Sequence, residues 1–155
     1  MIFVAVGTQF PFDRMIRIVD EWVGDNNESA FAQIAEGKYI PKNMQWKAFI
    51  DADEYNRRVE QADLVVAHAG MGNIITAREK QVPIIVMNRQ YKLGEHRNDH
   101  QADGLKWMDK LTGVYAAPDN KRLIDLLNRY KTLEKPTPSD NQRQNDLIQF
   151  IASCL

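Results

Sequence analysis

Short apolar runs alternate with amphipathic segments along most of the chain. The apolar runs are continuous and rich in β-branched residues, which is typical of strands buried on both faces. They predict strands at residues 2–6, 30–35, 44–49, 64–67, 84–87 and 113–116. Apolar residues at helical spacing predict helices over about 13–23, 51–62, 73–81, 98–111 and 120–130. Strands that alternate with helices form right-handed βαβ units, so we expect an α/β fold with a Rossmann-like doubly wound parallel sheet of about six strands.

The last part of the chain has a different pattern. Residues 135–138 (KPTP) predict a linker, since proline extends neither a helix nor a central strand. Beyond them Leu147, Ile151 and Leu155 lie at helical spacing and predict a final amphipathic helix. We therefore expect one domain over residues 1–134, followed by a segment, 135–155, that packs on the core or on a partner subunit.

Composition and charge narrow the class of protein. With 155 residues, of which 44% are hydrophobic and 26% charged, the chain has the size of one globular domain with a real core. A net charge of −1 gives no general reason to bind nucleic acid. The single cysteine, Cys154, excludes a disulfide scaffold within the chain and favours a reducing, cytoplasmic setting. We expect neither a signal peptide nor a membrane-spanning segment.

The most informative stretch is residues 64–81 (LVVAHAGMGNIITAREKQ). A buried strand runs through a glycine turn into a helix, which places unpaired amides at the positive end of that helix. The missing side chains at Gly70 and Gly72 let an anion approach those amides, so the stretch predicts a phosphate site. A second turn, Gly7-Thr8, follows the first strand. Both turns should lie beyond the carboxyl ends of the strands, where such sheets bind ligands.

The sequence does not match the common nucleotide-binding and metal-binding motifs. The turn after the first strand lacks the G-x-G-x-x-G pattern of NAD-binding proteins, and no Gly-Lys-Ser/Thr phosphate loop is present. Asp51 and Asp53 form a D-x-D pattern, but Asp51 with Glu54 has the spacing of a helix capping box. His96 and His100 lie four residues apart without an evident third ligand. We predict no metal site.

Three motifs, in this order, carry a resemblance to a known family: Gly7-Thr8, residues 68–72 (HAGMG) and residues 98–101 (NDHQ). With these motifs the sequence resembles, over nearly its whole length, the C-terminal domain of glycosyltransferase family 28. That domain is the nucleotide-sugar-binding half of GT-B enzymes. The resemblance extends to the small separate subunit of two-component enzymes, of the dolichol-linked N-acetylglucosamine transferase and bacterial exopolysaccharide types. It implies a UDP-sugar as substrate, with no cofactor and no metal.

The resemblance also implies roles for matching residues. Thr8, Gly70 and Gly72 would hold the donor diphosphate with the amides near Asn73, residues 49–51 (FID) would hold uracil, and residues 98–101 would contact the sugar. The expected donor-binding set is Gly7, Thr8, Phe49, Ile50, His68, Ala69, Gly70, Met71, Gly72, Asn73, Thr76, Arg89, Glu95, Asn98, Asp99, His100 and Gln101.

Several of these residues have a second interpretation. His68 is the candidate catalytic residue, although it could be a packed histidine; its place beside a glycine turn favours function. Thr8 could simply begin a helix, Phe49 could belong to the core, and Arg89 could be a solvated charge or could neutralise the leaving diphosphate. Thr76 departs from the family, which usually has a glutamate there that bonds both ribose hydroxyls; a hydroxyl makes one such contact.

The expected reaction is inverting sugar transfer, in which amides and the helix dipole stabilise the leaving diphosphate. Inversion requires a base near the acceptor hydroxyl, and in GT-B enzymes that base usually belongs to the other domain. We therefore expect a heterodimer with a membrane-associated subunit that binds a lipid-linked saccharide, at the cytoplasmic face of the membrane. Two alternatives stay open: a regulatory module that binds nucleotide sugars without catalysis, and an NAD-binding Rossmann protein.

Overall fold

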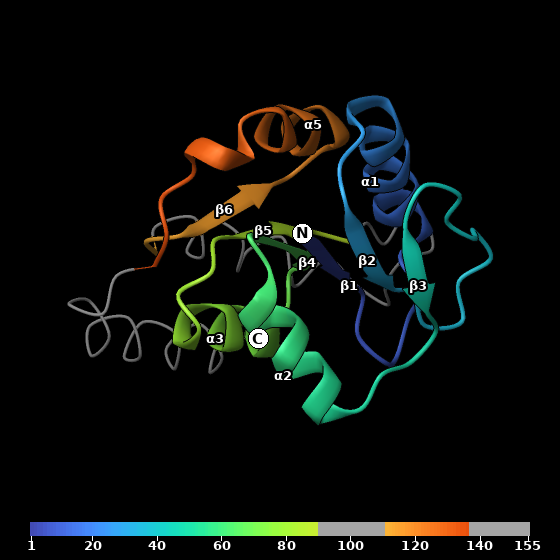
Figure 1. Cartoon of the computed structure of the whole chain (residues 1–155), viewed down its shortest axis with the longest axis horizontal. Helices are drawn as coiled ribbons and strands as arrows, with labels where there is room; N and C mark the ends of the chain where they lie inside the picture. Colours follow the sequence, from blue (N-terminus) through green and yellow to red (C-terminus); the bar gives the residue numbers. More distant parts are fainter. Residues whose placement is uncertain (90–110, 137–155) are drawn as a thin grey trace.

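The computed structural model describes residues 1–89 and 111–136. They form a six-stranded, fully parallel sheet with the order β3-β2-β1-β4-β5-β6 (Figure 1). The strands are β1 (Ile2–Ala5), β2 (Ala30–Gln33), β3 (Gln45–Lys47), β4 (Leu64–His68), β5 (Ile84–Met87) and β6 (Val114–Ala117). The predicted doubly wound α/β fold is confirmed.

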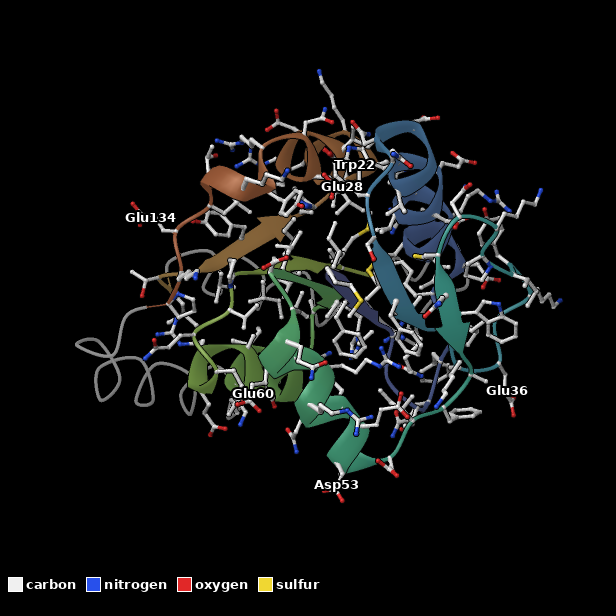
Figure 2. The ribbon with its side chains drawn as sticks, viewed as in Figure 1. Trp22, Glu28, Glu36, Asp53, Glu60 and Glu134 are labelled. Carbon is white, nitrogen blue, oxygen red and sulfur yellow. The ribbon has the colours of Figure 1, made fainter. Side chains whose placement is uncertain are left out.

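Helices cover both faces of the sheet. Those described are α1 (Asp13–Asn26), α2 (Ala52–Gln61), α3 (Met71–Glu79) and α5 (Asn120–Asn128), with a 3₁₀ turn η2 (Tyr130–Thr132). Helices α1 and α5 lie on one face, and α2 and α3 lie on the other (Figure 1). The exposed acidic side chains of α2, Asp53 and Glu60, lie at the periphery (Figure 2). None of the helices in the described ranges is long and apolar enough to cross a membrane.

The alternation of side chains along each strand divides the core in two. Ile2 and Val4 of β1 belong to the cluster under α1 and α5, whereas Phe3 and Ala5 belong to the cluster under α2 and α3. All residues of β1 and β5 are buried, because helices cover them on both sides. The edge strand β3 differs, since all three of its residues are exposed.

The boundaries differ from the prediction at several places. Strand β3 is shorter than the predicted 44–49 because it pairs with β2 alone, over three residues. Helix α1 continues through Gly24 and ends only where Asn27 takes a left-handed conformation, with φ 52°. Helix α3 begins at Met71 rather than Asn73, because Gly70 is still extended and forms its N-cap. The predicted helices at 98–111 and beyond 138 lie outside the described residues, so the division at residue 134 stays a prediction.

Candidate functional site

The two glycine turns meet at the carboxyl edge of the sheet. Strands β1 and β4 are neighbours, with Ala5 opposite Ala67, so the residues that follow each strand lie side by side. A Cβ atom built on Gly7 would be 2.9 Å from Cε1 of His68. The expectation that both turns share one edge is confirmed, and we refer to residues 7–8 and 68–73 together as the rim.

The absence of a side chain has a different consequence at Gly7 and Gly70 than at Gly72. A Cβ on Gly70 would lie 2.6 Å from Nε2 of His68, and Gly7 has a φ of +83° besides its closeness to the same ring. These two glycines therefore make room for the imidazole. A Cβ on Gly72 would meet nothing within 4 Å, so open space lies beside the first turn of α3.

The amides of the rim divide into two groups. Those of Gly7, Ala69 and Gly70 donate to Gln33 Oε1, to Met87 O and to His68 O, at 3.0, 2.9 and 2.8 Å. The first amides of α3 have no acceptor within the helix, and the N-cap Gly70 offers no side chain to them. By contrast, Asp51 caps α2 through the amide of Glu54 at 2.8 Å, as the sequence predicted. The positive end of α3 is therefore the part of the rim built to meet an anion.

Gln33 holds the turn at Gly7 in place. It is the last residue of β2 and only 5% exposed. Its Oε1 accepts from the amides of Val6 and Gly7, and its Nε2 donates to the carbonyl oxygens of Gly7 and Ala48, all at 2.9–3.1 Å. One side chain thus joins the carboxyl ends of β1 and β2 to the loop after β3.

A cavity of about 320 Å³ adjoins the rim. It lies between the ends of β1 and β2 and the start of α2, and its lining residues are Ala5, Gly7, Thr8, Gln33, Ile50, Asp51, Ala52, Tyr55 and Asn73. Four of the expected donor-binding residues line it: Gly7, Thr8, Ile50 and Asn73. The sequence interpretation singled out neither Gln33 nor Tyr55 as a site residue. A polar residue at the end of an otherwise buried strand is the signal that could have identified Gln33.

The remaining expected residues occupy varied positions. Phe49, which precedes the lining residue Ile50, is 49% exposed. The Thr76 hydroxyl donates to Gly72 O at 3.0 Å. Arg89 is 4% exposed; its Nη2 donates to the carbonyl oxygens of Val6 and Phe10, which fastens the loop after β1. Ala69 is buried and Met71 is half-buried at the start of α3. The set Glu95, Asn98, Asp99, His100 and Gln101 lies outside the described residues.

His68 and Asn73 are linked to α2. Nδ2 of Asn73 is 3.3 Å from Nδ1 of His68, and the Tyr55 hydroxyl donates to Oδ1 of the same amide at 2.5 Å. Burial raises the pKa of Tyr55, so the hydroxyl keeps its proton at neutral pH. Within residues 1–89 and 111–136, no three His, Cys, Asp or Glu side chains gather as a metal site requires.

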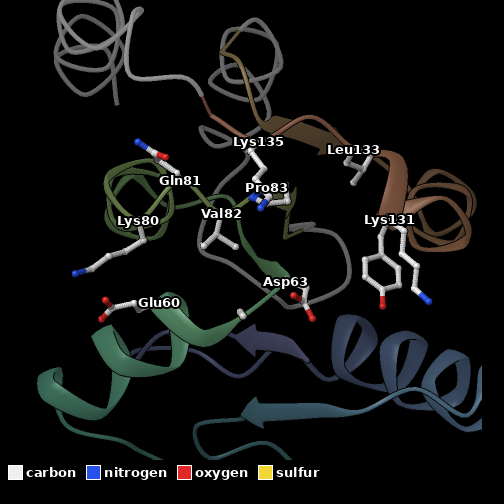
Figure 3. A pocket seen from close by; sticks show the side chains of 11 residues that line it. Glu60, Asp63, Lys80, Gln81, Val82, Pro83, Lys131, Leu133 and Lys135 are labelled. Carbon is white, nitrogen blue, oxygen red and sulfur yellow. The ribbon is translucent and has the colours of Figure 1, made fainter.

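A larger cavity, of about 470 Å³, lies at the opposite edge of the sheet (Figure 3). Asp63 and Pro83, which precede β4 and β5, line it together with Lys80 at the C-cap of α3 and with lysines from the segment after α5. Its charges are of both signs, since Glu60 and Asp63 line it together with Lys80 and Lys131 (Figure 3). Neither glycine turn reaches it, so the rim remains the candidate site.

Comparison with known proteins agrees with this geometry. Residues 1–144 match the model of the glycosyltransferase family 28 C-terminal domain. The chain belongs to this family. The resemblance inferred from the glycine turns is thereby confirmed, and we refer to the chain as the family 28 domain.

Its relatives include the UDP-N-acetylglucosamine transferase subunit ALG13 of human and mouse. The family 28 domain is 30% identical to the human protein over 122 residues, which is 70% of this chain, and 31% identical to the mouse protein over 108 residues, which is 61%. It spans only about a tenth of their length, 10% and 9% respectively.

Solved structures share the fold. An NMR structure of ALG13 superposes with a TM-score of 0.67 at 18% identity, covering 98% of this chain and 96% of that one. The glycotransferase of kitacinnamycin superposes with a TM-score of 0.54 at 17% identity, covering 98% of this chain and 39% of the larger enzyme.

Proposed function

We propose that the family 28 domain binds a UDP-sugar at the rim and is the donor-binding subunit of a two-component inverting glycosyltransferase. The observation that carries the proposal is the first turn of α3, whose N-cap is a glycine and beside which Gly72 leaves open space. A diphosphate placed there would accept hydrogen bonds from backbone amides and would be stabilised by the helix dipole.

The cavity next to the rim suits the remainder of the nucleotide. Ile50 lines it, and Phe49, the preceding residue in the chain, is exposed, so apolar side chains are available for a flat base. Thr8 also lines the cavity and contributes a hydroxyl group to it. The relatives named as UDP-N-acetylglucosamine transferase subunits make UDP-N-acetylglucosamine the first donor to test.

In the proposed reaction, the bond from the anomeric carbon to the diphosphate breaks as the acceptor hydroxyl attacks. Negative charge grows on the diphosphate, and fixed amides stabilise it without rearranging. His68 is the candidate residue of this chain nearest the reaction. We propose that the base and the binding site for a lipid-linked saccharide belong to a membrane-associated partner, with polysaccharide or glycolipid synthesis at the cytoplasmic face of the membrane as the setting.

Calorimetric titration tests donor binding. UDP, UDP-N-acetylglucosamine, UDP-glucose, UDP-galactose and UDP-glucuronate are compared with NAD, and we expect binding of UDP and of a UDP-sugar but not of NAD. In Gly72→Ala the added methyl group enters the space that a diphosphate would use, so affinity should fall at least tenfold. Folding stability should not fall, because alanine favours a helix over glycine by about 1 kcal/mol. Glu79→Ala, at the exposed far end of α3, is the matched control.

Activity with a partner tests the two-component arrangement. The domain is expressed alone and together with a candidate acceptor-binding subunit from the same genome, and sugar transfer to a lipid-linked acceptor is measured. We expect transfer only by the pair. Full turnover by the domain alone contradicts the division of roles, and UDP-sugar binding without transfer in any combination favours a regulatory module.

A further inference from the structure

Tyr55 joins two helices through one hydrogen bond at the candidate site. It belongs to α2, and its hydroxyl reaches Oδ1 of Asn73 in the first turn of α3 at 2.5 Å. The ring is held from the other side, since it packs edge-on against Phe3 of β1 with centroids 5.8 Å apart. The position of the hydroxyl is therefore set by the core rather than by solvent.

In the structure the amide oxygen of Asn73 pairs with Tyr55, which leaves the NH₂ end of the amide for His68. The amide oxygen can only accept a hydrogen bond, and the Tyr55 hydroxyl supplies one. The NH₂ end is then directed at Nδ1 of His68, 3.3 Å away, which requires Nδ1 to be the acceptor. In a neutral imidazole the proton consequently lies on Nε2.

Nε2 is also the ring atom nearest the glycine turn. It lies 2.6 Å from the position of the Cβ that Gly70 lacks, at the side of the ring next to the start of α3. An Nε2–H group placed there is a hydrogen-bond donor, which suits a phosphate oxygen, whereas the other tautomer would present a lone pair that repels it.

We propose that Tyr55 is a positioning residue that fixes, through Asn73, the Nε2–H tautomer of His68. The consequence for diphosphate binding rests on the proposed function. Tyr55 needs no contact with the nucleotide for this role, which distinguishes it from the donor-binding residues inferred from sequence.

The tautomer is measured directly, in the absence of nucleotide. The protein is labelled with ¹⁵N-histidine, and long-range ¹H–¹⁵N spectra at about pH 8, above the ordinary pKa of histidine, separate protonated from unprotonated ring nitrogens. The signals of His68 are assigned by their loss in His68→Gln. We expect a single Nε2–H tautomer in the wild type and a mixture of both tautomers in Tyr55→Phe.

A second variant tests whether Asn73 donates a hydrogen bond to His68. In Asn73→Asp the carboxylate cannot donate, so Nδ1 must carry a proton and the tautomer should reverse. Tyr130→Phe is the matched control, because it removes a hydroxyl that bonds Glu28 at 3.1 Å, on the other face of the sheet. It should leave the His68 spectrum unchanged.

Binding is measured separately with UDP. Tyr55→Phe should weaken UDP binding by roughly threefold to tenfold, the effect of one misdirected hydrogen bond, and Tyr130→Phe should not. A wild-type ring protonated on Nδ1, or a Tyr55→Phe spectrum identical to the wild type, overturns the inference. Absence of UDP binding by the wild type overturns the proposed function instead. The spectra still decide whether Tyr55 fixes the tautomer of His68.

Discussion

The side-chain amide of Gln33 bonds both the N–H and the carbonyl oxygen of Gly7. Its Oε1 accepts from the Gly7 amide at 3.0 Å and its Nε2 donates to the Gly7 carbonyl oxygen at 2.9 Å. Two bonds in opposite directions hold Gly7 at its φ of +83°. The rim is thus rigid on the β1 side before any ligand arrives, which lowers the cost of ordering it on binding.

Replacing Gln33 by leucine tests this support. Leucine keeps most of the volume but leaves the Gly7 amide and two carbonyl oxygens without their partner. An unsatisfied group costs about 1–3 kcal/mol when fully buried, and these three are only part-buried, so each should cost less. We expect the free energy of unfolding to fall by about 2–4 kcal/mol in urea titrations, with weaker UDP binding. Gln45→Leu, on the exposed strand β3, should change stability by less than about 0.5 kcal/mol. Equal effects of the two substitutions would contradict the supporting role of Gln33.

Gly70 and His68 should be energetically coupled. The backbone of Gly70 is extended, with φ −125° and ψ 141°, so alanine fits the backbone and only the His68 ring opposes it. We expect Gly70→Ala to lower the free energy of unfolding by about 1–3 kcal/mol, as overpacking does. In a His68→Ala background the same substitution should cost almost nothing. A double-mutant cycle by urea unfolding measures the coupling, and additive effects would exclude contact between the two positions.

Thr76 is the place to test ribose recognition. Its hydroxyl is directed back to Gly72 O within α3, and the family usually has a glutamate at this position. Thr76→Glu should strengthen UDP binding by roughly threefold to tenfold, since a carboxylate can accept from both ribose hydroxyls. Calorimetry with 2′,3′-dideoxy-UDP should show no gain. Thr76→Met, of similar length without a carboxylate, is the control, and a gain in that variant would argue against ribose contact.

Stability at alkaline pH should depend on Tyr39. Burial, together with a hydrogen bond to the fully buried Asp20 at 2.7 Å, raises the pKa of Tyr39 to about 12. The unfolded chain releases this proton near the ordinary value of 10. The folded state therefore holds more protons between pH 10 and 12, and stability falls as the pH rises through that window. Urea unfolding at several pH values should show a shallower decline for Tyr39→Phe than for the wild type. Parallel declines would contradict the assignment.

Hydrophobic pattern predicted the sheet well because its central strands are buried on both faces. Strands β1, β4 and β5 are continuous apolar runs whose only stable place is between two layers of helices. Strand β3 was less predictable, since an exposed edge strand has no apolar periodicity to mark it. The start of α3 was placed two residues late because glycine is a poor helix former in the interior, whereas the first turn tolerates it.

The candidate site could be predicted in position but not in detail. The turns at Gly7 and Gly70 follow adjacent buried strands, and parallel topology brings such turns to one edge. The sequence interpretation assigned Gly70 to phosphate approach and Gly7 to the donor-binding set, whereas in the structure both glycines accommodate the ring of His68. The contacts of Gln33 and Tyr55 depend on residues 26 and 18 positions away in the chain, a distance over which local patterns carry no information.

The division of the core by the sheet matters for protein engineering and for divergence among homologues. Trp22 and Tyr130 pack edge-to-face at 6.0 Å on one side, whereas Tyr55 and Ile74 lie on the other, with the candidate site. Substitutions between α1 and α5 can therefore raise heat tolerance while leaving ligand preference alone. Changes between α2 and α3 alter ligand preference at little cost to the opposite layer, so the two properties can be optimised in separate libraries.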